Sequence, residues 1–503
     1  MSPLCSNTTL LRKSDISSTT FHRHKSDSTG GNDTDDPFKV LDTWGSIEQD
    51  PDYEEFSQKV FRMKFQGHTV LVVQPYKIMK KTSIVSHPSL RLAEAVALVQ
   101  SIPNWKVVSA VAYSIRSWNS NPLFGSTNMW KIASKVKSDP RITAVVVSID
   151  ILNLDQLVLL QKSFGVPVYD RYTIVIQIFH NHAVSKAARL QVSMAEIPYL
   201  RQCLDGIPAG MEDRLGDDFA AIGGASRTSI ERRRELLKRR EHKIKTELEN
   251  LARQRQVVRK GRARTNTPTV AIVGYTNAGK TSLIQVLTKE LSIQPRNRLF
   301  ATLDVSAHRS QLPSGLQLVY IDTVGFMSDL PDNLIQSFKA TLEDAMYADL
   351  LLHVWDVSHP ESELQIKHVT KVLSSLSVEE KTLQNMITIG NKIDKLSDSE
   401  RESFVEKYPD VKLISCVTGQ GVVELEKLIE SNLIKVTNRR NIVLKVRSGG
   451  PEHVWLLENA TVTGSDVDKD QNYMLVNTLM TEGELNKFKS YFIVRHKQKY
   501  IFE

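Results

Sequence analysis

Residues 274–281 have the composition and spacing of a loop that wraps phosphate groups. Two glycines, Gly274 and Gly279, are separated by four residues, and a lysine and a threonine follow directly. Glycines at these places let the backbone bend around an anion, so that amides at the start of the next helix point at it. Lys280 would reach the β- and γ-phosphates of a nucleoside triphosphate, and the Thr281 hydroxyl would hold Mg²⁺. The run therefore predicts a nucleotide site with Mg²⁺ as its cofactor.

Two further groups of polar residues point to the same chemistry. Asp322–Gly325 would place a carboxylate in the Mg²⁺ shell, through a water molecule, and a glycine amide beside the γ-phosphate. Asn391–Asp394 ends in a carboxylate that can accept two hydrogen bonds from the guanine N1–H and 2-amino groups. Adenine lacks that pair of donors, so ATP would leave the Asp394 carboxylate desolvated and unpaired. The sequence therefore predicts GTP and GDP as ligands, with Ser415–Val417 in the loop that caps the base.

Short apolar runs stand before these groups and fit the strands of a mostly parallel sheet. They are Val270–Val273, Val319–Ile321, Met386–Ile389 and Leu413–Cys416, and Ser282–Thr288 fits the helix that leaves the phosphate loop. Four signatures in order, each at the end of an apolar run, predict a P-loop GTPase domain. A further run, Leu350–Trp355, contains His353, which we expect to be a core or strand-end histidine. We assign no role to Asp356 and His359 beyond it.

The chain divides into five parts by composition and periodicity. We expect a disordered tail or transit peptide over 1–40, a small α/β domain over 67–172, a helical hairpin linker over 173–266, the P-loop GTPase domain over 269–436 and a small α+β module over 439–503. The predicted fold class is therefore α/β, with a mostly parallel sheet in the GTPase domain.

The individual elements follow from the same patterns. In the small α/β domain we predict strands over His68–Val73, Val107–Tyr113 and Ile142–Ile149, and helices over Leu90–Val99 and Leu154–Lys162. In the linker, Thr173–Asp205 predicts one long helix and Ser229–Arg259 a second, with an apolar seam at Ile230, Leu237, Ile244, Leu248 and Leu251. In the last module we predict strands over Ile442–Val446, His453–Leu457, Met474–Val476 and Tyr491–Val494, and a helix near Thr481–Lys487.

The basic charge of the chain is concentrated in one segment. The net charge is +8, whereas Arg227–Arg264 holds 15 Lys plus Arg against 5 Glu, so the remaining residues carry a net −2. An exposed helix face usually mixes signs, and arginine-rich helices suit the phosphate backbone of structured RNA. We therefore predict RNA contact and no DNA, with a protein partner or solubility as the alternative. The candidate RNA-binding residues are Arg232, Arg233, Arg234, Lys238, Arg239 and Arg240.

Several features bear on the compartment. No apolar run approaches the roughly 20 residues that cross a bilayer, and Lys499–Glu503 carries no cysteine for prenylation, so we expect no membrane anchor. Cys5, Cys203 and Cys416 lack metal-site spacing, which favours free thiols in a reducing compartment. The first 30 residues are rich in Ser and Thr with a basic excess, which favours a mitochondrial transit peptide and a matrix location. The alternative is a disordered tail on a cytoplasmic protein.

Several short runs closely resemble the HflX family of ribosome-associated GTPases. They are the phosphate loop 274–281, Leu299–Asp304, Asp322–Phe326, Asp170–Tyr172, Leu190–Val192 and Ala195–Leu200. The resemblance covers roughly residues 67 to 500 and is greatest to the mitochondrial branch. It implies a GTPase that binds the ribosome, mainly through large-subunit rRNA, and splits it into subunits, acting as a monomer.

The resemblance also implies which residues bind nucleotide. They are Gly274, Tyr275, Thr276, Asn277, Ala278, Gly279, Lys280, Thr281, Ser282, Phe300, Ala301, Thr302, Leu303, Asp304, Asp322, Thr323, Val324, Gly325, Asn391, Lys392, Ile393, Asp394, Ser415, Cys416 and Val417. Thr302 would complete the Mg²⁺ shell only when the γ-phosphate is present, in a loop that orders with GTP. Asn277 would hold a K⁺ ion or, alternatively, bond the loop backbone. Phe326 stands where many signalling GTPases carry a water-orienting glutamine, so intrinsic hydrolysis should be slow without a partner, and the ring could equally pack against the sheet.

Two places depart from the family pattern. Ser226–Ser229 replaces a Gly-Glu-Thr-Gln run at the start of the second linker helix, and Gly125–Asn128 replaces a Gly-Lys-Gly-Lys run in the small α/β domain. We therefore predict no second nucleotide site in that domain.

The alternative to ribosome splitting is a GTP-gated assembly factor that binds an immature large subunit. The sequence does not separate the two functions, because both need the same GTPase and the same RNA-binding surface.

Overall fold

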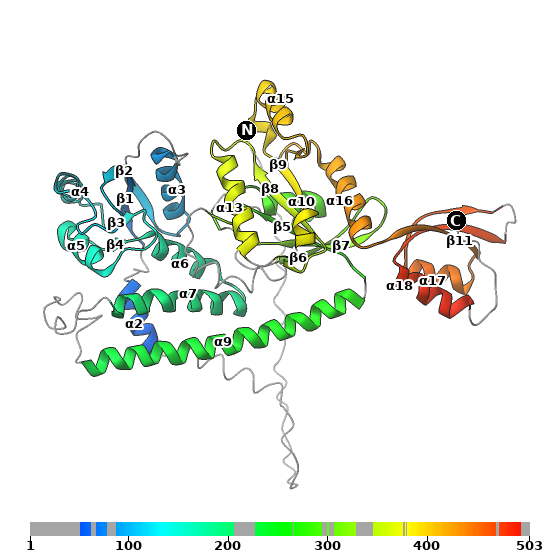
Figure 1. Ribbon diagram of the computed structural model, residues 1–503, viewed down its shortest axis with the longest axis horizontal. Coiled ribbons are helices and arrows are strands. Elements are labelled where there is room, and N and C mark those ends of the chain that lie inside the picture. Colours follow the sequence, from blue (N-terminus) through cyan, green and yellow to red (C-terminus); the bar gives the residue numbers. More distant parts are fainter. Residues whose placement is uncertain are drawn as a thin grey trace, which may run out of the picture. The chain divides into compact units, whose positions relative to one another are not determined.

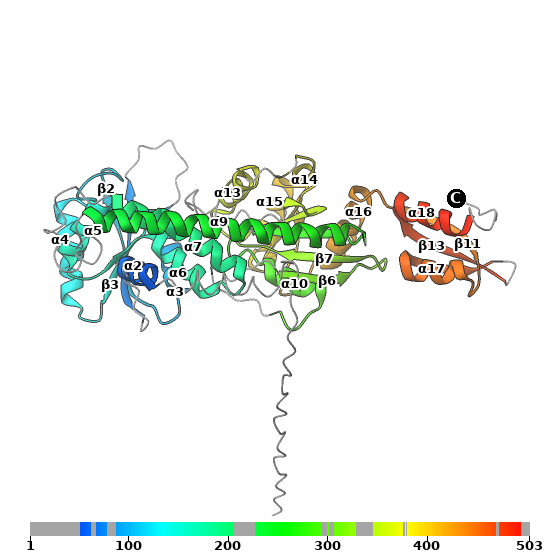
Figure 2. The same cartoon turned by 90° about the horizontal axis from the view of Figure 1, so that it is seen from below.

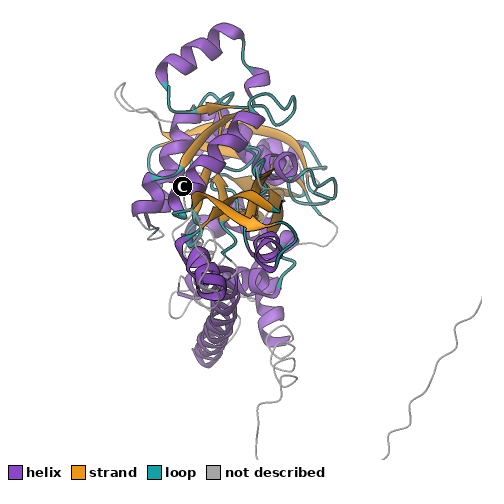
Figure 3. Cartoon of the chain, turned by 90° about the vertical axis from the view of Figure 1, so that its right-hand side faces the viewer, coloured by secondary structure: helices purple, strands orange, loops and turns teal. Residues whose placement is uncertain are grey.

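The computed structural model describes residues 51–61, 67–77, 87–205, 227–264, 266–293, 299–300, 306–327, 346–375, 378, 380–468 and 472–493. Three sheets organise these residues, and helices border the strands (Figure 3). The predicted α/β fold class with a helical linker and a last module of mixed structure is confirmed. Within the described residues, no helix combines the length and the apolar composition that crossing a membrane requires.

The first sheet is parallel, with strand order β2-β1-β3-β4. Its strands are β1 (Thr69–Lys77), β2 (Lys106–Ile115), β3 (Ala144–Val147) and β4 (Val168–Tyr169), and its helices include α3 (Pro88–Gln100), α4 (Ser126–Ser138) and α5 (Leu154–Phe164). The apolar sides of α4 and α5 form one core with β1 and β3, through Ile132, Leu160 and Val145 among others. The sequence pattern does not predict α4.

The linker consists of three helices rather than the two that were predicted. They are α6 (Arg171–His182), α7 (Lys186–Asp205) and α9 (Arg227–Arg264). The single helix predicted over Thr173–Asp205 is wrong because Ala183 has an extended backbone, with φ −72° and ψ 101°, which ends α6. α7 runs alongside α9 (Figures 1 and 2), and the seam residues Ile230, Leu237 and Ile244 are buried.

A short helix that precedes the first sheet packs against this linker. α2 (Pro51–Phe61) contacts α7 and buries Tyr53 and Phe56. The Arg240 guanidinium of α9 lies 3.6 Å from the centroid of the Tyr53 ring, and that of Arg233 lies 5.1 Å from the Phe56 ring. The apolar seam of α9 therefore extends into a row of cation–aromatic contacts.

The second sheet has the order β10-β9-β8-β5-β7-β6, parallel except for β6. Its strands are β5 (Thr269–Gly274), β6 (Ser306–Gln311), β7 (Gln317–Asp322), β8 (Leu350–Asp356), β9 (Ile387–Asn391) and β10 (Lys412–Leu413). Its helices are α10 (Lys280–Thr288), α13 (Ser362–Ser375), α14 (Glu380–Gln384), the 3₁₀ turn η1 (Ile393–Lys395), α15 (Asp398–Lys407) and α16 (Val422–Val436). The carboxyl ends of the parallel strands meet at one edge, which is where open α/β sheets bind ligands.

The third sheet is antiparallel, with the order β11-β13-β12. It comprises β11 (Arg440–Arg447), β12 (Thr461–Val467) and β13 (Tyr473–Met480), together with α17 (Pro451–Asn459), α18 (Glu482–Phe488) and the π-helical turn η2 (Lys489–Ile493). Two predicted strands are wrong here: His453–Leu457 lies inside α17, and Tyr491 lies in η2. Pro451 at the first position of α17 fixes a helical φ without losing a hydrogen bond, so the apolar run after it becomes helical.

Candidate nucleotide-binding site

The phosphate loop joins β5 to α10, and each of its glycines is required by its surroundings. Gly274 has φ 156°, and a Cβ atom there would lie 2.4 Å from the Val354 carbonyl oxygen. Gly279 has φ 101°, and a Cβ there would lie 2.2 Å from the Asn391 Nδ2 atom. Side chains at these positions would collide with β8 and β9, so only glycine lets the loop pass this close to both strands.

Lys280, the first residue of α10, is buried and turned back toward the loop. Its Nζ atom donates to the carbonyl oxygens of Gly274 at 3.3 Å and Tyr275 at 3.0 Å. Burial lowers the pKa of Lys280 to about 8, although the Asp322 carboxylate acts in the opposite direction. A desolvated ammonium in a loop of backbone amides is a strong attractor for phosphate.

The residues that would hold Mg²⁺ lie together. Thr281 Oγ1 donates to Asp322 Oδ2 at 2.8 Å, so a hydroxyl and a carboxylate from the ends of two elements share one place. Hard oxygen ligands of this kind suit Mg²⁺, which keeps several waters and takes few protein ligands. Among the described residues, no group of three or more His, Cys, Asp or Glu lies close enough together to hold a metal ion.

The segment after β7 is fastened to the phosphate loop through its backbone. The Thr276 amide donates to the Phe326 carbonyl oxygen at 2.7 Å, and the Phe326 amide donates to the Gly274 carbonyl oxygen at 3.1 Å. A Cβ at Gly325 would lie 2.8 Å from Thr276 Cγ2, so the two segments touch. The Phe326 ring is buried, which agrees with the packing role and leaves no side-chain group there to orient water. Thr276 Oγ1 is buried and has no hydrogen-bond partner among the described residues.

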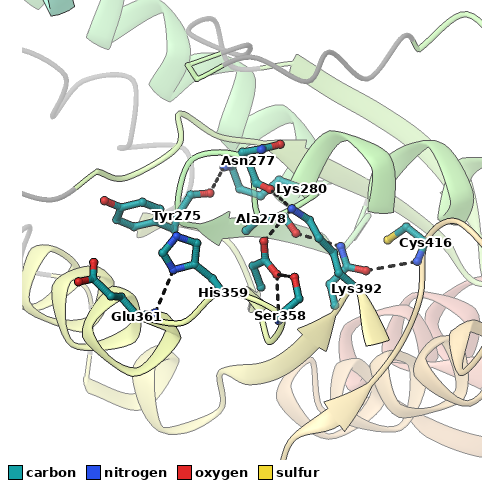
Figure 4. A network of polar contacts seen from close by, with 11 residues as sticks. Tyr275, Asn277, Ala278, Lys280, Ser358, His359, Glu361, Lys392 and Cys416 are labelled. Atoms are coloured by element: carbon teal, nitrogen blue, oxygen red, sulfur yellow. Dashed lines mark hydrogen bonds and ion pairs between the residues drawn. The ribbon is translucent and has the colours of Figure 1, made fainter. Parts of the chain in front are cut away.

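The base-recognition segments are hydrogen-bonded to the phosphate loop, and Figure 4 shows two of their residues, Lys392 and Cys416, beside it. Asn391 Nδ2 donates to the Ala278 carbonyl oxygen at 2.9 Å, and Asn391 Oδ1 accepts from the Cys416 amide at 3.2 Å. Ser415 Oγ donates to Asp394 Oδ1 at 2.6 Å and so orients the carboxylate that would read guanine. Burial raises the pKa of the Cys416 thiol to about 12, so this cysteine stays protonated.

Lys392 links the phosphate loop to Asp356, a residue to which the sequence analysis assigned no role. Its Nζ atom donates to the Asn277 carbonyl oxygen and to Asp356 Oδ2, both at 2.7 Å. The other oxygen of Asp356 accepts from Ser358 Oγ at 2.6 Å and from the Ser358 amide at 3.1 Å. Asp356 is the last residue of β8, beside the end of β9 in the sheet. The only signal in the sequence was its place at the end of an apolar run.

The remaining predicted nucleotide residues are in different situations. Ser282 lies in the first turn of α10, Thr323 Oγ1 donates to the Ile272 carbonyl oxygen at 2.7 Å, and Val324 and Ile393 are buried. Val417 is 84% exposed in the loop after β10. Residues 301–305, with the predicted switch residues Ala301, Thr302, Leu303 and Asp304, lie outside the described residues.

Phe300 packs against the linker helix α6. It has φ 53° and is buried, with its ring centroid 4.9 Å from that of Phe179 in α6 at an interplanar angle of 82°. An edge-to-face aromatic contact of this kind holds the ring in place, and the nucleotide contact of this residue stays a prediction.

Two other side chains near the site have structural roles. His353 is buried in β8, and burial together with the nearby Lys280 lowers its pKa to about 4, so the prediction of a core histidine is confirmed. The Tyr275 hydroxyl donates to Glu94 Oε1 of α3 at 2.8 Å, and Glu94 also accepts from Arg171 at 3.4 Å.

The six predicted RNA-binding residues of α9 do not share one environment. Arg232, Arg234, Lys238 and Arg239 are exposed, and two of them form ion pairs at the surface, Arg234 with Asp205 at 2.9 Å and Arg239 with Glu235 at 3.1 Å. Arg240 is 8% exposed and is packed on Tyr53, so its guanidinium is not accessible to an RNA phosphate in this conformation. Arg233 is half-buried over Phe56.

Three family models match the chain. They are described as 50S ribosome-binding GTPase over residues 269–392, GTP-binding GTPase Middle Region over 182–262, and GTP-binding GTPase N-terminal over 89–180.

Similar whole proteins agree with these matches. A Xenopus laevis protein named Putative GTP-binding protein 6 is 38% identical over 427 residues, which cover 85% of this chain and 80% of the relative. A GTPase HflX of Lacrimispora saccharolytica is 38% identical over 288 residues, or 57% of this chain and 66% of the relative. Among solved structures, a GTP-binding protein from Sulfolobus solfataricus in complex with GDP is similar over 73% of this chain and 99% of that chain, with 22% identity and a TM-score of 0.39.

Proposed function

This chain belongs to the HflX family of GTPases and is a GTP-hydrolysing enzyme, and from that premise we propose that it binds the ribosome and drives its subunits apart. The observation that carries the proposal is the continuity of the basic helix with the nucleotide site. α9 ends at Arg264, and β5 begins at Thr269 and ends at Gly274 in the phosphate loop. A change at the nucleotide can therefore reach the basic helix through a few residues of chain.

In the proposed cycle, the site residues act on GTP in defined places. Lys280 would leave its two carbonyl partners for the β- and γ-phosphates, and the Thr276 hydroxyl would gain a partner in the bound nucleotide. Thr281 and, through water, Asp322 would hold Mg²⁺, which neutralises charge on the β- and γ-phosphates. Asp394, oriented by Ser415, would select guanine.

The proposed hydrolysis step depends on a partner. Phe326 occupies the place of a water-orienting residue and is buried, so the chain supplies no such group at this position. We infer that the ribosome positions the attacking water or completes the phosphate environment, and that Thr302 signals the γ-phosphate. A K⁺ ion at Asn277 would supply positive charge between the phosphates, and replacing K⁺ by Na⁺ in a hydrolysis assay tests that part.

The exposed face of α9 is proposed to bind large-subunit rRNA. Arg232, Arg234 and Lys238 present cations to solvent, and phosphate contacts of this type give affinity without sequence preference. The name 50S ribosome-binding GTPase, which describes the family model over 269–392, supports a ribosomal target.

Light scattering of intact ribosomes tests the proposal. Adding the protein with GTP should lower the scattered intensity as subunits separate, and adding it with GDP should not. Sedimentation of the protein with the large subunit, without any loss of intact ribosomes, would contradict splitting and favour the assembly factor instead.

We also propose a mitochondrial matrix location, with the cytoplasm as the alternative. The support is the composition of residues 1–40, which lie outside the described residues. Co-sedimentation with mitochondrial and with cytosolic ribosomes in parallel would decide between the two compartments.

A further inference from the structure

Helix α4 carries the most exposed aromatic side chain of the described residues. Trp130 is 70% exposed, ahead of Tyr347 at 60% and Tyr491 at 52%. A tryptophan this exposed leaves a large apolar ring in water, and such rings are enriched where a protein meets a partner. The opposite side of α4, through Ile132 and Val136, is fully used in the core of the first sheet. The exposed tryptophan is therefore held on a rigid, well-anchored helix.

The residues around Trp130 are cationic or hydroxylic. α4 spans Ser126–Ser138 and contains three lysines and no acidic residue. Thr127, Trp130, Lys131 and Lys137 are all exposed and lie at helical spacings that place them along one side. No acidic residue lies within the helix. Asp139, directly after its last residue, pairs with Arg141 at 2.8 Å. We call Thr127, Trp130, Lys131 and Lys137 the α4 stripe.

We propose that the α4 stripe binds an unpaired stretch of RNA, with a base stacked on Trp130 and phosphates beside Lys131 and Lys137. An exposed indole with cations on both sides is the chemistry that recognises single-stranded nucleic acid, because every base has a stacking face and every linkage carries a charge. A membrane surface or an acidic protein would use the lysines, but neither requires a flat ring between them. The inference deepens the proposed ribosome binding and rests on it only for the identity of the RNA.

The α4 stripe complements α9. The described part of α9 presents cations and no aromatic side chain. Such a surface can bind the phosphate backbone of an RNA helix but offers no ring on which a base could stack. The α4 stripe would supply that stacking surface at a place where rRNA bases are unstacked. The two surfaces therefore predict different preferences: α9 binds single and double strands alike, and the α4 stripe binds single strands only.

The test measures that preference in the full chain, without ribosomes or GTP. A fluorescent 12-residue oligouridylate and an RNA duplex of equal charge are titrated by anisotropy with the unmodified protein and with Trp130→Ala. We expect Trp130→Ala to weaken oligouridylate binding about tenfold and duplex binding less than twofold. Trp130→Phe, which keeps an aromatic face, should recover most of the loss. Lys131→Gln with Lys137→Gln should lower the salt dependence of oligouridylate binding.

Matched controls test whether the effect depends on the α4 stripe or on the loss of any exposed ring or lysine. Tyr491→Ala removes another exposed ring, and Lys367→Gln with Lys371→Gln removes two exposed lysines from α13, so both should bind oligouridylate as the unmodified protein does. If Trp130→Ala misfolds, photocrosslinking of 4-thiouridine RNA to residues 126–138 of the unmodified protein still decides, and its absence there overturns the proposal. Unchanged single-strand preference in Trp130→Ala, with weaker ribosome co-sedimentation, would also overturn it and assign the α4 stripe to a ribosomal protein. Because the oligonucleotide assay needs no subunit splitting, its failure is distinct from failure of the proposed function.

Discussion

Replacing Asp356 by alanine should weaken GTP binding, although Asp356 would not touch the nucleotide. Its carboxylate holds the Lys392 ammonium at 2.7 Å, and that ammonium in turn holds the Asn277 carbonyl of the phosphate loop. The side chains of Lys392 and Asp356 are 18% and 14% exposed, so the pair is largely withdrawn from water. Removing the carboxylate leaves a mostly buried cation with one remaining bond in this network.

The expected magnitude follows from that burial. A hydrogen bond to a charged group is worth about 1.5–3 kcal/mol, and breaking a fully buried pair costs about 3–5 kcal/mol. Since both groups keep some contact with solvent, we take about 2 kcal/mol, shared between the stability of the GTPase domain and nucleotide affinity. GTP affinity should then fall roughly tenfold and by no more than about thirtyfold. Asp356→Asn should lose less, because an amide oxygen can still accept from Lys392.

Titration with a fluorescent GTP analogue measures the affinity, and thermal unfolding with and without GDP measures the stability. Asp398→Ala is the matched control, because that carboxylate is 95% exposed where it lies 3.5 Å from Arg401. Exposed pairs contribute about 0–1 kcal/mol, so the control should bind GTP almost normally. If Asp356→Ala binds GTP as tightly as Asp398→Ala does, the Lys392 bridge does not support the phosphate loop and the reasoning is wrong.

Three further predictions concern base choice, rRNA binding and pH. Asp394→Asn should shift the preference of the site from GTP to xanthosine triphosphate by roughly a hundredfold in a competition assay, and equal binding of ATP and GTP by the unmodified protein would show that the base is not read as proposed. Reversing four exposed cations of α9 to glutamate should weaken ribosome binding and lower its log–log salt slope by just under about one unit for each lost phosphate contact, while GTP affinity stays within a few-fold; an unchanged slope would contradict the rRNA role. These four are Arg232, Arg234, Lys238 and Arg239. Burial acts to lower the pKa of His180, but its Glu196 partner outweighs that effect, so the net pKa is raised. The ion pair therefore stabilises the fold fully below pH about 6.5, and this stabilisation is lost as pH rises through the folded-state pKa. The difference in Tm between the unmodified protein and His180→Gln should therefore shrink from pH 6 to pH 9, and a difference that grows over this range would refute the assignment.

Local signals were sufficient for the nucleotide loop. Gly274, Gly279 and Lys280 are recognisable because their roles depend on their own backbone and spacing. Asp356 was missed because its role depends on β8 lying next to β9, and that neighbourhood is a property of the sheet and is absent from the local sequence. The burial of Arg240 could not be predicted for a related reason: its partner Tyr53 is far away in the chain, in a helix that gave no sequence signal.

Element types were missed where competing local patterns overlapped. Val454–Leu457 is an apolar run of strand length, but buried Glu452 and Leu456 are four residues apart and mark one face of a helix. α4 escaped notice because only Ile132 and Val136 are buried in it, and exposed or polar residues, including Trp130, Lys131 and Lys135, surround them in the sequence. In both cases the decisive information was which side packs on a neighbouring sheet.

The length of α9 has a mechanical consequence. Thirty-eight residues of α-helix span about 57 Å, and the segment contains no proline at which it could kink. Its one glycine, Gly261, is close to the end that leads into β5. A tilt of about 5° at that end therefore displaces the far end by about 5 Å, which is nearly one helical turn. α9 thus has the proportions of a lever arm, because a small rotation at the end that β5 joins to the phosphate loop becomes a large displacement at the other end.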